Sequence, residues 1–128
     1  LHLLRGRAGA LGGCWELDIF ALPIPIGPRP GRPHFPLCFL AVETKLGQIL
    51  GANLSEPWLT VSEKQDEVIQ IMRKANQLPL EMRVKSDKVR RIVEPITRIL
   101  GIKLRVGSLP ILEQAKASLG EHLSGRHA

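Results

Sequence analysis

Three carboxylates occupy positions in the sequence where chemistry could take place. Glu43 closes a continuous apolar run of strand length. Asp87 follows a later strand-like segment, and Glu67 lies on the helical segment between them. Carboxylate oxygens are the ligands that Mg²⁺ prefers, and two such ions can activate a water and stabilise the leaving oxygen of a phosphodiester. Glu43, Glu67 and Asp87 are therefore candidate ligands for Mg²⁺.

Each of these carboxylates also has a use that needs no metal. Asp87 stands where a helix needs a cap, Glu67 fits a solvated helix face, and Glu43 precedes a turn. These roles explain all three residues, so the sequence assigns no catalytic residue and we expect no cofactor. Cys14 and Cys38 lack a C-x-x-C partner or histidines at metal-ligand spacing, which indicates reduced thiols rather than a zinc site or a disulfide.

The positive charge of the chain is concentrated in one segment. Residues 82–105 contain eight basic and two acidic residues, and this excess equals the formal net charge of the whole chain, +6. If the two strands expected in this segment lie side by side in parallel, their basic side chains share one sheet face that could bind nucleic acid. The candidates are Arg83, Lys85, Lys103 and Arg105. No aromatic residue in the segment is available to stack on bases, and a solvated basic face is the alternative.

Other functional classes lack support in the sequence. The chain contains no Walker loop, no G-x-G-x-x-G and no G-x-S-x-G motif, which argues against nucleotide hydrolysis, dinucleotide binding and serine nucleophiles. No apolar run is long enough to span a membrane. We therefore expect a cytoplasmic protein with no membrane partner.

The composition predicts a single domain with variable ends. We expect residues 1–13 to form a flexible leader, residues 14–120 the domain, and residues 121–128 a frayed tail. Within the domain, residues 23–36 are too rich in proline for a helix or a central strand, so we expect a loop or an extended arm.

Hydrophobic patterning predicts the elements that position the candidate residues. A short strand at 14–20 comes first, followed by a strand at 37–42 that is buried on both faces, its hairpin partner at 48–52 and a brief strand at 58–61. An amphipathic helix at 63–76 begins with a capping box formed by Ser62 and Gln65. Two further strand–helix units follow, with strands at 80–85 and 102–106 and helices that begin at 87 and after Ser108.

This order, β-β-β-α-β-α-β-α from residue 37, predicts a three-layer α/β fold. Three hairpin-connected strands and two right-handed crossovers build a mixed five-stranded sheet, with the strand at 37–42 in its middle. This topology resembles the ribonuclease H-like fold. In enzymes of that fold, carboxylates at the ends of the central strands hold two Mg²⁺ ions, so the resemblance implies a metal-dependent nuclease site with Glu43, Glu67 and Asp87 as its candidate residues. Mg²⁺ is an expected cofactor only in that case.

The chain also resembles an uncharacterised bacterial family, a domain of unknown function, over about residues 15–120. The matching features are Trp15-Glu16-Leu17-Asp18, Pro36 before the run at 37–42, Gly47-Gln48-Ile49-Leu50, Pro79 before Arg83-Val84, Leu100-Gly101-Ile102 and Leu109-Pro110. The resemblance implies a fold and a bacterial origin, and it transfers no catalytic residue.

Two functions are compatible with these patterns. The first is a non-catalytic binding or accessory domain of a bacterial cytoplasmic protein, with another protein as partner. The alternative is a basic nucleic-acid-binding domain, with or without metal-dependent nuclease activity.

Overall fold

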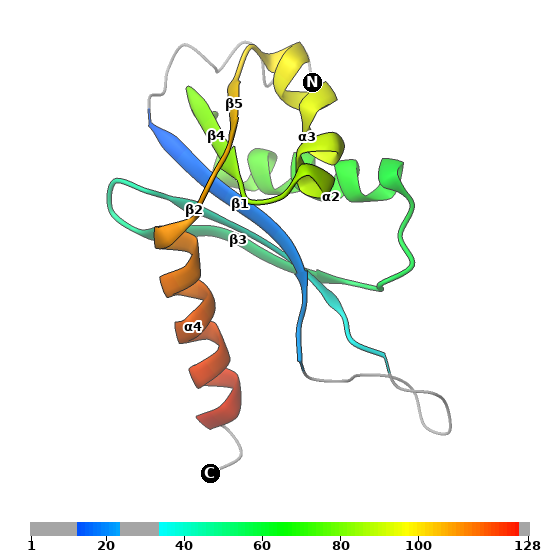
Figure 1. The fold of residues 1–128 in the computed structure, drawn as a ribbon, viewed down its shortest axis with the longest axis vertical. Helices are drawn as coiled ribbons and strands as arrows, with labels where there is room; N and C mark the ends of the chain where they lie inside the picture. The colour runs from blue at the N-terminus through cyan, green and yellow to red at the C-terminus, as the bar shows by residue number, and fades with distance from the viewer. Residues whose placement is uncertain (1–12, 24–33, 126–128) are drawn as a thin grey trace.

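A computed structural model describes residues 13–23 and 34–125 of the chain (Figure 1). Most of the expected leader and of the proline-rich segment, and the last residues of the expected tail, lie outside the described residues. Along the described part, none of the helices is long and apolar enough to cross a bilayer.

The described residues form one mixed five-stranded sheet with helices on both faces, which confirms the predicted α/β fold class. The strands are β1 (Cys14–Ala21), β2 (Leu37–Glu43), β3 (Gln48–Ser55), β4 (Glu81–Val84) and β5 (Lys103–Val106). Their order across the sheet is β3-β2-β1-β4-β5. β1 pairs antiparallel with β2, and β2 with β3, whereas β1 with β4 and β4 with β5 are parallel pairs.

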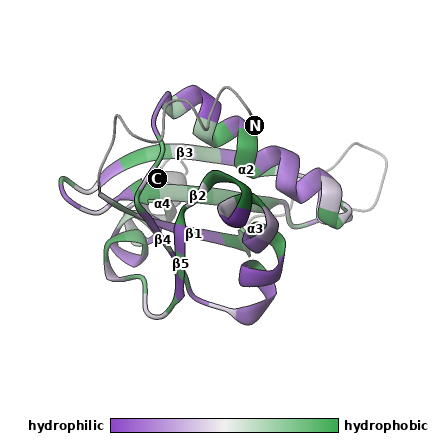
Figure 2. Cartoon of the chain, turned by 90° about the horizontal axis from the view of Figure 1, so that it is seen from above, coloured by the Kyte–Doolittle hydropathy of each residue, from purple (hydrophilic) through white to green (hydrophobic). Residues whose placement is uncertain are grey.

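The centre of the sheet differs from the prediction. β1, expected as a short first strand, lies in the middle, and β2 lies beside it. The acidic residues Glu16 and Asp18 are untypical of a central strand, yet both are buried. They give β1 a hydrophilic stretch beside the hydrophobic β2 (Figure 2). β2 is nevertheless buried on both faces, as predicted, because its side chains alternate between two separate apolar clusters.

The prediction of a strand at 58–61 is also wrong, because this segment leads into a helix. Thr60 is the N-cap of α2 (Val61–Ala75): its side chain accepts a hydrogen bond from the backbone of Glu63, whose carboxylate accepts one from the backbone of Thr60. This reciprocal pair is the capping box of α2, in place of the expected Ser62 and Gln65. The three strands before α2 are therefore β1, β2 and β3.

The other two helices follow their local signals. α3 (Asp87–Leu100) begins after the N-cap Ser86 and ends at Gly101, whose φ of 73° suits a glycine. α4 (Pro110–Gly125) begins with proline in its first turn. α2 and α3 cover one face of the sheet and form the larger apolar cluster, whereas α4 covers the other face over β1 and β2 (Figure 1).

β3 is held against α2 at a position where only glycine fits. A Cβ atom on Gly51 would lie 2.9 Å from both Cγ atoms of Ile71, which is shorter than real Cβ contacts. Ile71 is buried and β-branched, so it has little freedom to move aside. The close contact fixes the inner face of β3 and leaves its other face exposed on the side of α4.

We expect Gly51→Ala to lower the free energy of unfolding by about 1–3 kcal/mol, because the added methyl group overpacks the contact with Ile71. Urea unfolding measures this change. Gly107→Ala is the matched control, because its Cβ would meet its nearest neighbour at 3.9 Å. Combining Gly51→Ala with Ile71→Ala should cost less than the sum of the two single changes, and strict additivity would contradict the proposed contact.

Candidate functional site

A buried carboxylate on the central strand joins β1 to α4. Glu16 has no exposed surface, and its Oε1 accepts a hydrogen bond from the backbone N–H of Leu112 at 2.7 Å. Leu112 lies in the first turn of α4, where backbone N–H groups lack partners within the helix. The other oxygen of Glu16 faces the guanidinium of Arg83 at 3.4 Å. Glu16 therefore anchors the start of α4 to the sheet.

The basic strands carry their own counter-ions. β4 and β5 are parallel neighbours, as expected, and their register sets Arg83 opposite Arg105. Glu81 lies on the same face, 3.5 Å from Arg83 and 3.1 Å from Arg105. Lys85 pairs with Glu113 of α4 at 3.5 Å. Among the described residues, Lys103 is the member of the four candidates that has no ion pair.

The three arginines of α3 are neutralised in the same way. Arg90 contacts Asp87 at 2.7 Å and Glu94 at 2.5 Å. Arg91 lies 2.9 Å from Asp87, and Arg98 lies 3.1 Å from Glu94. Counting both regions, six of the eight basic residues in 82–105 have an acidic partner. The segment therefore presents much less free charge than its composition indicates.

The three carboxylates singled out from the sequence do not come together. Glu43 accepts hydrogen bonds from the backbone of Lys45 and Leu46 and so closes the β2–β3 turn. Glu67 accepts from Asn53 Nδ2 at 3.2 Å and Ser55 Oγ at 3.0 Å, which ties α2 to β3. Each of these two side chains is thus engaged within its own region of the fold.

Asp87 lies at the other end of the sheet from Glu43. The register sets Glu43 opposite Trp15, and Trp15 opposite Met82, whereas Asp87 follows the far end of β4. The Asp87 carboxylate faces two arginines of its own helix, and its hydrogen bond with Arg90 lowers its pKa.

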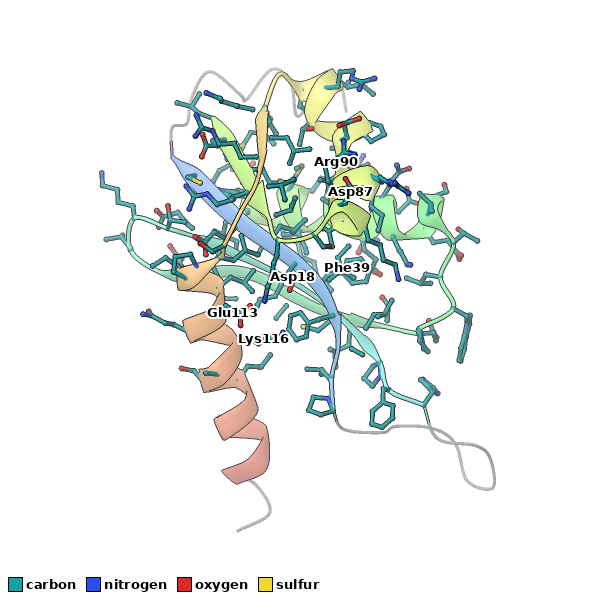
Figure 3. The ribbon with its side chains drawn as sticks, viewed as in Figure 1. Asp18, Phe39, Asp87, Arg90, Glu113 and Lys116 are labelled. Atoms are coloured by element: carbon teal, nitrogen blue, oxygen red, sulfur yellow. The ribbon has the colours of Figure 1, made fainter. Side chains whose placement is uncertain are left out.

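Asp18 is a buried acid that the sequence analysis did not select. It lies on β1 with 8% of its surface exposed, and burial raises its pKa. The charges of Lys116, Glu113 and Lys85 act on it, and Figure 3 shows Asp18, Glu113 and Lys116 gathered beside α4. Its position on the central strand could have identified it as a candidate site residue. The prediction placed the segment 37–42 at the centre instead of β1, so Asp18 was not selected.

These acids do not fit a divalent cation. Glu113 already faces the ammonium group of Lys85, and Lys116 is a second cation near Asp18, held over the ring of Phe20 at 4.1 Å. In the described part of the chain, no three side chains of His, Cys, Asp or Glu are grouped closely enough to hold a metal ion. Lysine cations therefore stand beside the acids where Mg²⁺ would need free oxygens.

The most unusual exposed surface belongs to the edge strand β3. From Gln48 to Ser55 the strand has no charged residue, and Ile49 and Leu54 are 47% and 55% exposed. Both face the side of α4, since Ile49 is opposite Val42 and Leu54 is opposite Cys38. Further exposed apolar side chains flank the strand: Leu46, Trp58 and Val61.

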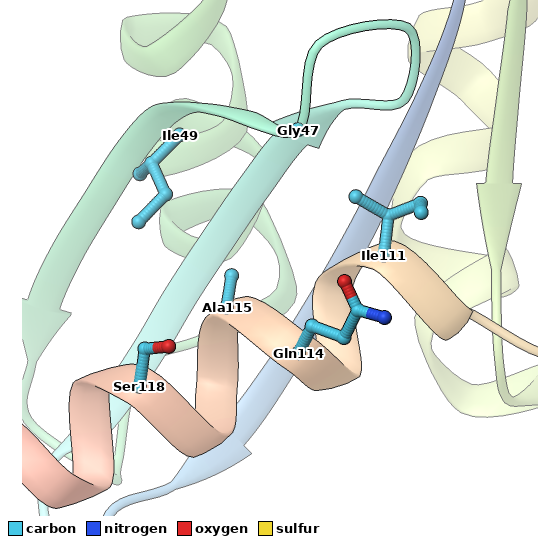
Figure 4. Close-up of a pocket in the computed structure, with 6 residues that line it drawn as sticks. All are labelled: Gly47, Ile49, Ile111, Gln114, Ala115 and Ser118. Carbon is cyan, nitrogen blue, oxygen red and sulfur yellow. The ribbon is translucent and has the colours of Figure 1, made fainter.

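A groove runs between β3 and α4. It has a volume of about 270 Å³ and is lined by Gly47, Ile49, Ile111, Gln114, Ala115 and Ser118 (Figure 4). Its lining is mainly aliphatic with two polar side chains from α4. α4 covers β1 and β2 and leaves this face of β3 open.

Comparison with protein families gives a match over residues 4–120 to DUF6930, described as a domain of unknown function. The chain belongs to this family. The match takes in every strand of the sheet, α2, α3 and most of α4. The DUF6930 chain has no match among curated proteins.

Solved structures of retroviral integrases share the fold of this DUF6930 chain. The catalytic core of BIV integrase aligns with a TM-score of 0.64 at 20% identity, over 89% of this chain and 70% of that one. The HTLV-2 integrase core in complex with magnesium aligns at 0.61 and 13% identity, over 82% and 65%. A simian T-cell lymphotropic virus intasome chain aligns at 0.64 and 14% identity, over 88% and 40%. At these identities the likeness shows a ribonuclease H-like fold.

We expect Glu16→Ala to destabilise the DUF6930 domain by about 2–4 kcal/mol, because it leaves the N–H of Leu112 and one face of Arg83 without a partner. Glu16→Gln retains a carbonyl acceptor for Leu112 and should cost about 1 kcal/mol. Urea unfolding at neutral pH compares them, with the surface change Glu94→Ala as control. Equal stability of wild type and Glu16→Ala would show that α4 is anchored by other contacts.

Proposed function

We propose that this chain is a non-catalytic ribonuclease H-like domain that binds another polypeptide along β3. One observation carries the proposal: β3 is an uncharged edge strand of eight residues with exposed apolar side chains. The backbone groups on the outer side of such a strand are free to pair with an extended segment, and a partner strand can add to the sheet.

The two edges of the sheet differ in the way this function requires. β5 has four residues, of which Lys103 and Arg105 are charged, and short charged edges resist pairing with another chain. β3 has neither protection. An added strand would place every second side chain on the side of α4, over the groove beside Ile49. This geometry suits a partner segment with aliphatic residues at alternate positions.

The partners of the acidic residues support binding rather than catalysis. Asp87 is held by two arginines, Glu16 by Leu112 and Arg83, and Glu113 by Lys85. A group that is already neutralised in this way is a poor ligand for a metal ion or a poor acceptor for a proton. The proposal includes a bacterial cytoplasmic setting, and the free thiols of Cys14 and Cys38 suit the reducing conditions of a cytoplasm; burial raises the pKa of Cys38 to about 11.

Selection of displayed peptides tests the proposal. Peptides selected on the wild-type domain should be extended, with aliphatic residues at alternate positions, and should lose about tenfold or more in affinity on Ile49→Lys, because a lysine would project into the apolar groove. Ile99→Lys is the matched control, since Ile99 lies on α3 with the same exposed fraction, 47%. Selected peptides that bind both variants as tightly as wild type would contradict binding along β3.

Nucleic-acid binding is a second candidate function. It is favoured by the shared sheet face of Arg83, Lys85, Lys103 and Arg105. If this face binds phosphates, Lys103→Gln should weaken binding to labelled DNA or RNA and reduce the slope of affinity against salt by about one. Lys45→Gln, in the β2–β3 turn, is the matched control. Equal salt slopes for wild type, Lys103→Gln and Lys45→Gln would exclude nucleic-acid binding by the basic face.

The same samples test catalysis. Incubation with Mg²⁺ or Mn²⁺ should leave labelled DNA, RNA and hybrid uncut by wild type, Asp18→Asn, Glu43→Gln, Glu67→Gln and Asp87→Asn alike. Metal-dependent cleavage by wild type that is lost in any one of these variants would overturn the non-catalytic proposal.

A further inference from the structure

We infer that the polypeptide bound along β3 is the same strand of a second copy of this chain. This inference rests on the proposed function and names its partner. The two β3 strands would run antiparallel about a two-fold axis at Ala52, joining two five-stranded sheets into one.

The sequence of β3 is self-complementary in this register. Ile49 of one copy faces Leu54 of the other, and the two-fold axis repeats this pair, so that two apolar pairs form on the side of α4. At the ends, Gln48 faces Ser55, which pairs polar with polar. At the axis the small residue Ala52 faces its own copy on the side of α4, and Gly51 faces Asn53 on the side of α2. Cross-strand apolar pairs of this kind each contribute roughly 0.2–1 kcal/mol.

A bulge makes this pairing possible. The register shifts between Ala41 and Val42 of β2, so that Leu50 is an extra residue on β3. In a regular strand, Ile49 and Leu54 would point to opposite faces. The extra residue brings both to the side of α4, where Ile111 and Ala115 line the groove beside Ile49 (Figure 4).

The charge distribution also favours a second copy at this edge. Each chain has a net charge of +6, which opposes association. The basic residues of 82–105, however, whose excess equals this net charge, lie in the β4–α3–β5 region, at the opposite edge of the sheet from β3. At about 4.8 Å per strand, pairing at β3 sets the two β4 strands seven spacings, or about 34 Å, apart, well beyond a Debye length of about 8 Å at physiological salt. β3 itself contributes no charge to repel its copy.

Sedimentation velocity on the full chain tests the inference. Wild type should shift with concentration from a species of 14.2 kDa to one of twice that mass. Ile49→Glu and Leu54→Lys should each weaken self-association at least tenfold, because each sets a charge against an apolar side chain in both halves of the interface. Ile99→Glu should behave as wild type.

Mixing the two variants gives the sharper result. In a mixed dimer the carboxylate introduced by Ile49→Glu in one chain faces the ammonium group introduced by Leu54→Lys in the other. The second half of the interface keeps its original apolar pair, because each chain retains one of the two aliphatic residues. The mixture should therefore recover association that neither variant shows alone, and a generic apolar surface would not produce this recovery.

Two outcomes would overturn self-pairing. The first is a wild-type chain that stays monomeric up to millimolar concentration, and the second is a dimer that is unaffected by Ile49→Glu. If selected peptides still depend on Ile49 in either case, binding along β3 stands and its partner is another protein.

Discussion

The burial of Glu16 is the constraint on which the arrangement of this domain depends. A carboxylate on the central strand, out of contact with water, is tolerated only when both oxygens have partners. These partners are the first turn of α4 on one side and Arg83 of β4 on the other. The same side chain therefore fixes where α4 starts and draws the positive charge of β4 inward, which explains why a basic sequence has a largely neutralised sheet face.

Anchoring α4 over β1 and β2 also determines what is left uncovered. Its apolar side chains, among them Leu112 and Ala115, pack on the inner strands, and the helix does not extend over β3. On the other face, the contact of Gly51 with Ile71 keeps α2 close to the same strand. α2 therefore packs on one face of β3, whereas the other face is exposed because α4 covers only β1 and β2.

Local signals were sufficient to predict much of this fold. Ser86 and Gly101 define α3 because capping depends on a few adjacent residues, and the run at 37–42 is apolar enough to indicate burial on both faces. The centre of the sheet was not predictable in this way. Glu16 is satisfied by residues 67 and 96 positions further along the chain, so that nothing near it indicates that it is buried.

The candidate site was predicted wrongly because the strand order was predicted wrongly. Placing 37–42 at the centre directed attention to Glu43, which closes a turn, and away from Asp18. The β-branched pair Thr60 and Val61 similarly indicated a strand, although Thr60 is a helix cap. The edge position of β3 depends on the pairing of all five strands, so its exposure could not be read from its own residues.

The bulge opposite Ala41 and Val42 means that the length of the β2–β3 hairpin matters as much as its composition. Family members that lack one residue between positions 49 and 54 would turn one of the two aliphatic side chains toward α2 and bring a polar one such as Asn53 to the outer face. Hairpins with similar residue content would then present different surfaces, so alignments of this family should treat single-residue gaps here as changes in surface chemistry.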